Sequence, residues 1–100
     1  MMELGGNIEL VGFKDLDVSQ MIVFKKIIGN HARKFSDTLE NSYKKLKIHM
    51  KKIGSEKSPK YEIKGTLQID NGNDINSSCT ENNVFVCIAN VLKKIESQLK

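Results

Sequence analysis

The chain has 100 residues, of which 39% are hydrophobic and 28% charged, a balance typical of one soluble globular domain. We expect this domain to span residues 1–100, with a disordered N-terminus at 1–6. Its 16 basic and 12 acidic residues give a formal net charge of +4, so charge alone does not indicate nucleic-acid binding. No apolar run approaches the roughly 20 residues that a membrane-spanning helix needs, and no signal-peptide pattern opens the chain, which predicts a cytoplasmic protein with no membrane partner.

The first third of the chain predicts a short strand followed by a long helix. Residues 7–10 alternate between polar and apolar side chains, the period of a strand with one buried face. Capping residues at 17–19 precede a helical pattern that runs to about Leu39. On a helical wheel Lys26 and Arg33 lie opposite the apolar face. That face is formed by Met21, Phe24, Ile27, Ile28 and Phe35.

Three further strands are expected in the middle of the chain. Residues 45–53 alternate between apolar and basic side chains, which predicts a half-buried strand with a basic outer face. Residues 61–69 alternate between mostly apolar and polar side chains, which predicts another strand, and Asn71-Gly72 predicts a tight turn into a weaker strand over 75–80. The basic outer positions of the first of these strands are Lys45, Lys47, His49 and Lys51.

Residues 82–100 carry the clearest helical pattern, with Thr80 or Asn82 as the expected cap. Their apolar side chains gather within about a third of the helix circumference, and Lys93 and Lys100 fall on the far side with Lys94 on a flank. The apolar stripe consists of Val84, Phe85, Ile88, Val91, Leu92, Ile95 and Leu99.

The element order is therefore β-α-β-β-β-α, which predicts an α+β fold. Because each strand has one apolar face and each helix one apolar stripe, we expect a four-stranded sheet with both helices packed on the same face, as in double-stranded-RNA-binding domains. The last three strands should form an antiparallel meander. The first strand should lie parallel to the second, because a helical crossover joins them.

No pattern in the sequence indicates catalysis, a metal site or a cofactor. Cys79 and Cys87 form no CxxC pair, and His31 and His49 lie in unrelated segments, so we expect two reduced thiols that act as small hydrophobic side chains. There is no Ser-His-Asp set, no acidic pair with obvious geometry and no phosphate-binding glycine loop, which argues against an enzyme with a small-molecule substrate. His31 falls on the apolar side of its helix and is expected to be partly buried.

The element order and the last helix resemble the ribosome hibernation-promoting factor family, also called ribosome-associated inhibitors or sigma-54 modulation proteins. The last helix of that family has an Asp or Asn, an apolar residue, an aromatic residue, two small residues and Ile, and later a run ending Lys-Leu-acid-x-Gln-Leu. Here Asn83-Val-Phe-Val-Cys-Ile88 and Lys94-Ile-Glu-Ser-Gln-Leu99 follow this pattern without a gap. Ala89-Asn90 departs from the Asp-Ala that is frequent in the family, and Ser97 stands where Arg is frequent.

The resemblance implies a protein that binds the RNA of the small ribosomal subunit between head and body, in the channel of tRNA and mRNA, and represses translation in idle cells. It implies no catalysis. It also implies a short form, because the C-terminal dimerisation domain of long members is absent from these residues, and we expect a monomer when the protein is free.

Two basic surfaces are candidates for contact with RNA. Two helices side by side on one sheet would bring their outer flanks together, so that cations of both helices converge on a phosphate backbone. We expect the shape and charge of folded RNA to be recognised rather than bases, because no aromatic pair on a strand forms a stacking platform. The candidate residues of this surface are Lys25, Lys26, Arg33, Lys93, Lys94 and Lys100.

The lysines of the basic strand form a second, weaker candidate strip. Lys45, Lys47 and Lys51 could contact RNA, but solubility and protection of an exposed sheet are the favoured explanation for them. Two other functions remain open. The chain could be a generic structured-RNA-binding domain without a link to the ribosome, or a small protein-interaction domain that uses the polar hairpin at 70–81.

Overall fold

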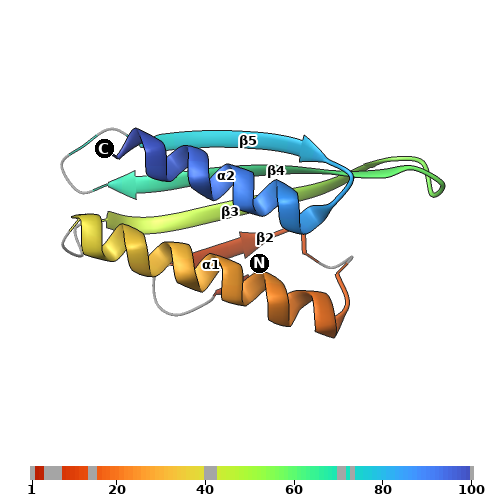
Figure 1. Ribbon diagram of the computed structural model, residues 1–100, viewed down its shortest axis with the longest axis horizontal. Coiled ribbons are helices and arrows are strands. Elements are labelled where there is room, and N and C mark those ends of the chain that lie inside the picture. The colour runs from red at the N-terminus through yellow and green to blue at the C-terminus, as the bar shows by residue number, and fades with distance from the viewer. Residues whose placement is uncertain are drawn as a thin grey trace.

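Two helices lie on one face of a mixed β-sheet in the computed structural model (Figure 1). The structure describes residues 2–3, 8–13, 16–39, 43–69, 72 and 74–99. Its elements are β1 (Met2–Glu3), β2 (Ile8–Val11), α1 (Val18–Leu39), β3 (Tyr43–Gly54), β4 (Pro59–Ile69), β5 (Ile75–Glu81) and α2 (Val84–Gln98).

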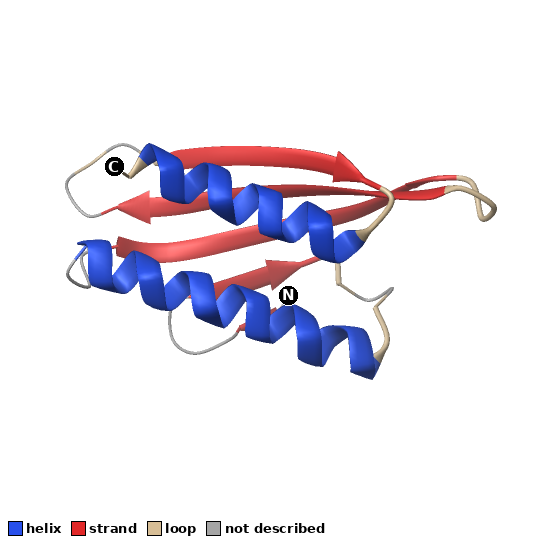
Figure 2. Ribbon diagram, in the orientation of Figure 1, coloured by secondary structure: helices blue, strands red, loops and turns tan. Residues whose placement is uncertain are grey.

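The order of the strands confirms the predicted topology. In the sheet order β1-β2-β3-β4-β5, β2 is parallel to β3, and β3, β4 and β5 form an antiparallel meander. Both helices cover the same face (Figure 2). From β2 onward the element order is β-α-β-β-β-α, the α+β fold that the alternation of side chains predicts.

Strand β1 was not predicted and lies in the segment 1–6 that we expected to be disordered. Met2 and Glu3 pair antiparallel with Leu10 and Glu9 of β2. This pairing uses backbone groups on the otherwise open edge of β2, which explains how so short a segment adds to the sheet.

The core lies between the sheet and the helices. The predicted inward side chains of β3 and most of the apolar stripes of both helices are buried. The remaining stripe residues, Met21, Ile27, Phe85 and Leu99, are partly buried against this core. α2 packs on β4 and β5, while α1 packs on β3 and against α2. The twelve largest fully buried side chains are Phe24, Phe35, Leu10, Ile28, Leu46, Ile48, Ile63, Leu67, Ile88, Leu92, Ile95 and Val91.

A glycine and a serine set the distance between α2 and the sheet. A Cβ on Gly65 would lie 2.6 Å from Cγ1 of Val91 and 3.1 Å from Cδ1 of Ile95, so the close approach of α2 to β4 requires glycine there. On β5 the Ser77 hydroxyl donates a hydrogen bond of 2.8 Å to the carbonyl of Val91. Both contacts fix the height and rotation of α2 over the sheet.

Each helix begins with a side-chain cap. The Asp17 carboxylate accepts a hydrogen bond of 2.8 Å from the backbone N–H of Gln20. In return, the side-chain oxygen of Gln20 accepts one of 3.1 Å from the backbone N–H of Asp17, which completes a capping box. For α2 the expected caps Thr80 and Asn82 are wrong, because β5 extends through Glu81 and the helix starts later. Asn83 is the cap, and its Oδ1 accepts from the N–H groups of Phe85 and Val86.

The β3–β4 hairpin is longer than the alternation predicted and extends past the end of the sheet where both helices begin (Figure 1). The predicted Asn71-Gly72 turn lies partly outside the described residues. Among the described residues, no helix combines the length and the hydropathy that a membrane crossing requires.

Candidate nucleic-acid interface

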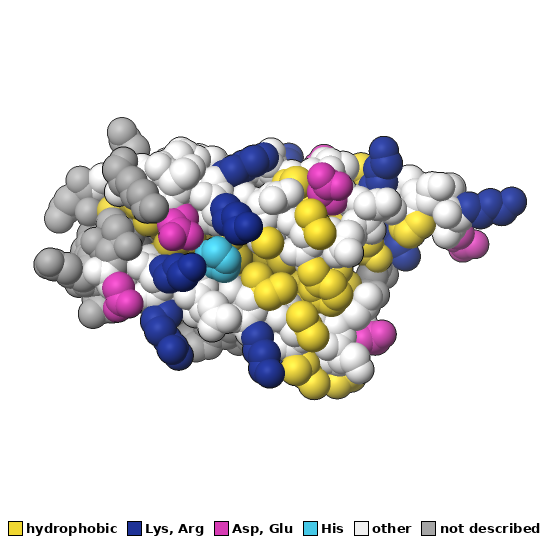
Figure 3. Space-filling view, in the orientation of Figure 1, with side chains coloured by type: hydrophobic (Ala, Val, Ile, Leu, Met, Phe, Trp, Pro, Cys, Tyr) yellow, Lys and Arg dark blue, Asp and Glu magenta, His cyan; other side chains and the backbone are white. Residues whose placement is uncertain are grey.

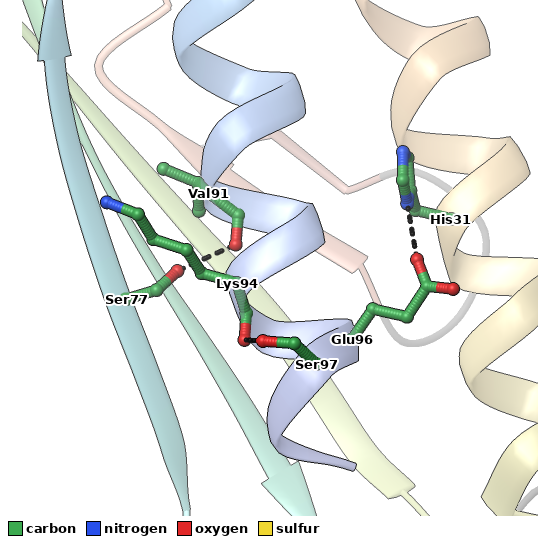
Figure 4. A network of polar contacts seen from close by, with 6 residues as sticks. All are labelled: His31, Ser77, Val91, Lys94, Glu96 and Ser97. Carbon is green, nitrogen blue, oxygen red and sulfur yellow. Dashed lines mark hydrogen bonds and ion pairs between the residues drawn. The ribbon is translucent and has the colours of Figure 1, made fainter. Parts of the chain in front are cut away.

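The seam between α1 and α2 contains a histidine and a carboxylate. His31 of α1 faces Glu96 of α2, with 3.6 Å between Nδ1 and Oε2, longer than a good hydrogen bond (Figure 4). The side chains are 13% and 28% exposed, so the contact is largely enclosed. The prediction of a partly buried His31 is confirmed, whereas a carboxylate in the seam was not predicted.

Two lysines flank this pair. The pKa of His31 lies below its ordinary value of 6.5, chiefly because burial disfavours the charged ring. The positive charges of Lys34 and Lys93 lower this pKa further, whereas the negative charge of Glu96 raises it. His31 is therefore neutral near pH 7. Lys93 of α2 and Lys34 of α1 both lie close enough to His31 to act on its pKa, whereas we expected Lys26 and Arg33 beside Lys93 and did not single out Lys34.

The other candidate cations of α1 point away from the seam. Lys26 and Arg33 are exposed, seven residues apart on the side of α1 opposite its buried face, and Lys25 is exposed beside them. These three cations lie on the same side of the molecule as Lys34 and Lys93. Within the described residues, no carboxylate forms an ion pair with any of the three. We use "helix face" for the outward surface of both helices, whose described cations are Lys25, Lys26, Arg33, Lys34, Lys93 and Lys94.

Lys94 lies on the flank of α2 that is farther from α1. Its Nζ donates a hydrogen bond of 2.9 Å to the Ser78 carbonyl of β5, and the Gln98 side chain donates one of 3.4 Å to the Asn76 carbonyl. Because β5 is the last strand of the sheet, these two side chains cover its open edge. Lys94 is thus less available to a ligand than the prediction assumed, and Lys100 lies outside the described residues.

The helix face is divided along its length. Hydrophobic side chains gather at the end where the helices begin, and Lys, Arg and the histidine lie toward the end where they finish (Figure 3). The apolar half contains large exposed side chains on both helices: Val18, Ile22, Val23 and Val86, which are 79%, 55%, 45% and 46% exposed. The cations of the helix face therefore occupy only part of the length of the helix pair.

The opposite face of the sheet carries more lysines than the sequence indicated. Lys45, Lys47 and Lys51 alternate with the buried residues of β3, and antiparallel pairing sets Lys64 opposite His49. Lys60 of β4 continues the row toward the hairpin end. We call this the open sheet face; its described basic residues are Lys45, Lys47, His49, Lys51, Lys60 and Lys64.

Two carboxylates partly offset these lysines. Glu9 of β2 pairs with Lys45 at 3.4 Å and lies opposite Lys47. Glu62 of β4 lies opposite Lys51 and 3.9 Å from Lys64. The lysines of this face outnumber Glu9 and Glu62, which leaves this part of the open sheet face positive.

The cysteines and histidines form no reactive or metal centre within the described ranges. No group of three or more His, Cys, Asp or Glu there is placed to hold a metal ion. Cys79 and Cys87 are free thiols, as predicted, and Cys87 is buried with its thiol 3.1 Å from the Cys79 carbonyl. Burial is the main cause, and the proximity of Cys79 the second, that raises the pKa of Cys87 to about 12. This thiol is therefore protonated and unreactive.

Comparison with known proteins identifies the fold. No protein-family model matches the sequence, and no curated protein matches it. Among solved structures, the chain is similar to the N-terminal domain of Protein Y from Thermus thermophilus, with a TM-score of 0.58 and 17% sequence identity. The match covers 95% of this chain and 97% of that one, so the two share an entire fold.

Proposed function

We propose that this protein binds the RNA of the small ribosomal subunit and represses translation in idle cells, as a hibernation factor without catalytic activity. The observation that carries the proposal is the fold shared with the Protein Y N-terminal domain, a member of the hibernation-promoting factor family, over nearly the whole chain. The sequence of the last helix gives the same family resemblance independently of the fold.

The structure gives a physical reason for the motif in that helix. Lys94 and Gln98, both part of the motif, bind carbonyls on the open edge of β5. Cys87, one of the two small residues of the motif, is fully buried between α2 and the sheet. These positions maintain the fold, so a match in them supports shared architecture, and the contact with RNA must come from other residues.

Basic residues on both faces suit a ligand that surrounds the domain. The helix face and the open sheet face lie on opposite sides of one sheet, and each has more cations than carboxylates among the described residues. A single RNA helix would use one of these faces. A channel with RNA on both sides, such as the space between the head and body of the small subunit, would use both and release counterions from both. We therefore assign Lys26, Arg33 and Lys93 to one contact, and Lys47 and Lys51 to the other.

Co-sedimentation with purified small subunits tests this function. We expect the protein to sediment with them at about 50 mM salt, to dissociate steeply as salt rises to about 200 mM, and to prefer intact subunits over plain duplex RNA. Equal affinity for duplex RNA would instead favour a generic RNA-binding domain. An absence of binding at the lower salt concentration would contradict both.

A further inference from the structure

We propose that the end of the molecule where both helices begin contains a binding site for one unpaired nucleotide of RNA, with the base and its phosphate held in two adjoining clefts. The proposal rests on the proposed RNA-binding function and extends it to base recognition, although no single strand carries an aromatic pair. The β3–β4 hairpin extends from this same end (Figure 1).

The first cleft combines aromatic and amide side chains. It has a volume of about 380 Å³, within the usual range of ligand pockets, and is lined by Gln20, Tyr61, Asn82, Asn83, Val84 and Phe85. Tyr61 comes from β4 and Phe85 from α2, so an aromatic pair in one cleft arises only when the strand and the helix are packed together. Aromatic rings offer the faces on which unpaired bases stack.

The amides of this cleft differ in their free hydrogen-bonding groups. The side-chain oxygens of Gln20 and Asn83 already accept from backbone N–H groups at the starts of α1 and α2. Among the described residues no hydrogen bond engages the side chain of Asn82, which is exposed. An amide with a free donor and a free acceptor is the side-chain group that binds the edge of a base by two hydrogen bonds, most typically that of adenine.

A second cleft adjoins the first and is basic. It has a volume of about 370 Å³ and is lined by Lys57, Ser58, Pro59, Lys60 and again Asn82. Asn82 thus borders both clefts. None of the residues that line either cleft is acidic. A base beside Tyr61 and Phe85 would leave its phosphate near Lys57 and Lys60, where the lysines favour it electrostatically.

The N-terminus of α2 is not itself the phosphate site. The N–H groups of Phe85 and Val86 are already bound by the Asn83 side chain, so the lysines of the hairpin must supply the positive charge. Lys60 also belongs to the open sheet face. The same RNA could therefore follow that face and place one unpaired nucleotide at its end.

The test measures binding of two fluorescein-labelled RNA hairpins by fluorescence anisotropy at about 50 mM salt. The hairpins are identical except that one has a single bulged adenosine. We expect the protein to bind the bulged hairpin more tightly, and Asn82→Ala to reduce that affinity about tenfold, the effect of losing one bidentate base contact. Asn82→Ala should leave affinity for the plain hairpin unchanged, whereas Lys57→Gln should weaken binding of both. Asn30→Ala, which removes an exposed asparagine of α1 outside the clefts, is the matched control.

The outcomes separate this inference from the proposed function. If the protein binds small subunits but Asn82→Ala and Asn30→Ala behave alike, the nucleotide site is wrong and the proposed function stands. If the bulge gives no preference, the nucleotide site is likewise wrong. If the wild-type protein binds neither small subunits nor either hairpin, both proposals are wrong. Because Asn82 is exposed and precedes the helix cap, its replacement leaves the core and Asn83 in place.

Discussion

The cations of the helix face and those of the open sheet face are distributed in different ways. On the helix face the cations lie toward one end, beside a half that exposes Ile22, Val23 and Val86. Glu96 sits in the seam itself. On the open sheet face lysines from two strands interleave along the sheet, with carboxylates beside them. The difference indicates that the position of charge on a helix pair depends on how each helix is turned about its own axis. In a sheet, the pairing of strands distributes the charged side chains along the whole face.

Charge reversal on each face separately is expected to have the largest effect. Lys26→Glu with Lys93→Glu should lower affinity for small subunits by more than about tenfold, because two attractive phosphate contacts become repulsive. Lys47→Glu with Lys51→Glu should do the same if RNA contacts both sides. Affinity as a function of salt should give a shallower slope for each double variant.

Lys44→Glu, which changes the charge of the protein by half as much, is the control. Lys44 is exposed on β3 and belongs to neither face as defined above. If the control loses half as much binding free energy as the double variants, net charge alone drives binding. If only one face responds, the RNA contact is one-sided.

Two glycine replacements are expected to change stability in opposite directions. Gly65→Ala should lower the free energy of unfolding by about 1–3 kcal/mol, since the new Cβ collides with Val91 and Ile95 and lifts α2 from the sheet. Gly29→Ala should raise it by about 0.5–1 kcal/mol, because a Cβ at this exposed helix position meets no atom within 4 Å. Urea denaturation measures both, and equal effects would contradict the packing described for α2.

Removal of the seam carboxylate should strengthen RNA binding slightly. Glu96→Gln keeps the size of the side chain but removes a negative charge beside Lys93, so affinity for small subunits should rise roughly twofold to fivefold, the scale of an exposed charge interaction. Asp74→Asn removes an exposed carboxylate that lies outside both faces and should have no effect. Unchanged affinity in Glu96→Gln would mean that RNA does not approach the seam.

The smallest effect concerns pH. Because the pKa of His31 is lowered in the folded protein, the unfolded chain binds a proton first as pH falls below about 6.5, and stability declines from there toward the folded pKa. His31→Gln should remove this part of the decline in denaturation experiments between about pH 7.5 and 5.5. His49→Gln, which removes an exposed histidine, should retain it; the opposite pattern would contradict the burial of His31.

The sequence predicted those features that depend on one element at a time. Alternation identified Leu46, Ile48 and Met50 as buried, and the helical stripe identified the buried side of α2. The identity of the seam residues depends instead on how α1 rotates against α2, which no local pattern encodes. Lys34 and Glu96 were therefore missed, although each lies on the edge of its apolar stripe.

Strand register explains the other omissions. Lys60 and Lys64 alternate outward in β4, but only the pairing with β3 sets them beside Lys51 and His49. The aromatic pair of the nucleotide cleft is a similar case, because Tyr61 and Phe85 belong to different elements. The sequence therefore predicted the individual helices and strands, but not which of their side chains come into contact.

Lysine acetylation followed by mass spectrometry, with and without bound small subunits, tests most directly whether both faces contact RNA. Binding should protect Lys26 and Lys93 on the helix face together with Lys47 and Lys51 on the open sheet face, while Lys44 should react equally in both states. Unchanged reactivity of all these lysines in the bound state would contradict this expectation.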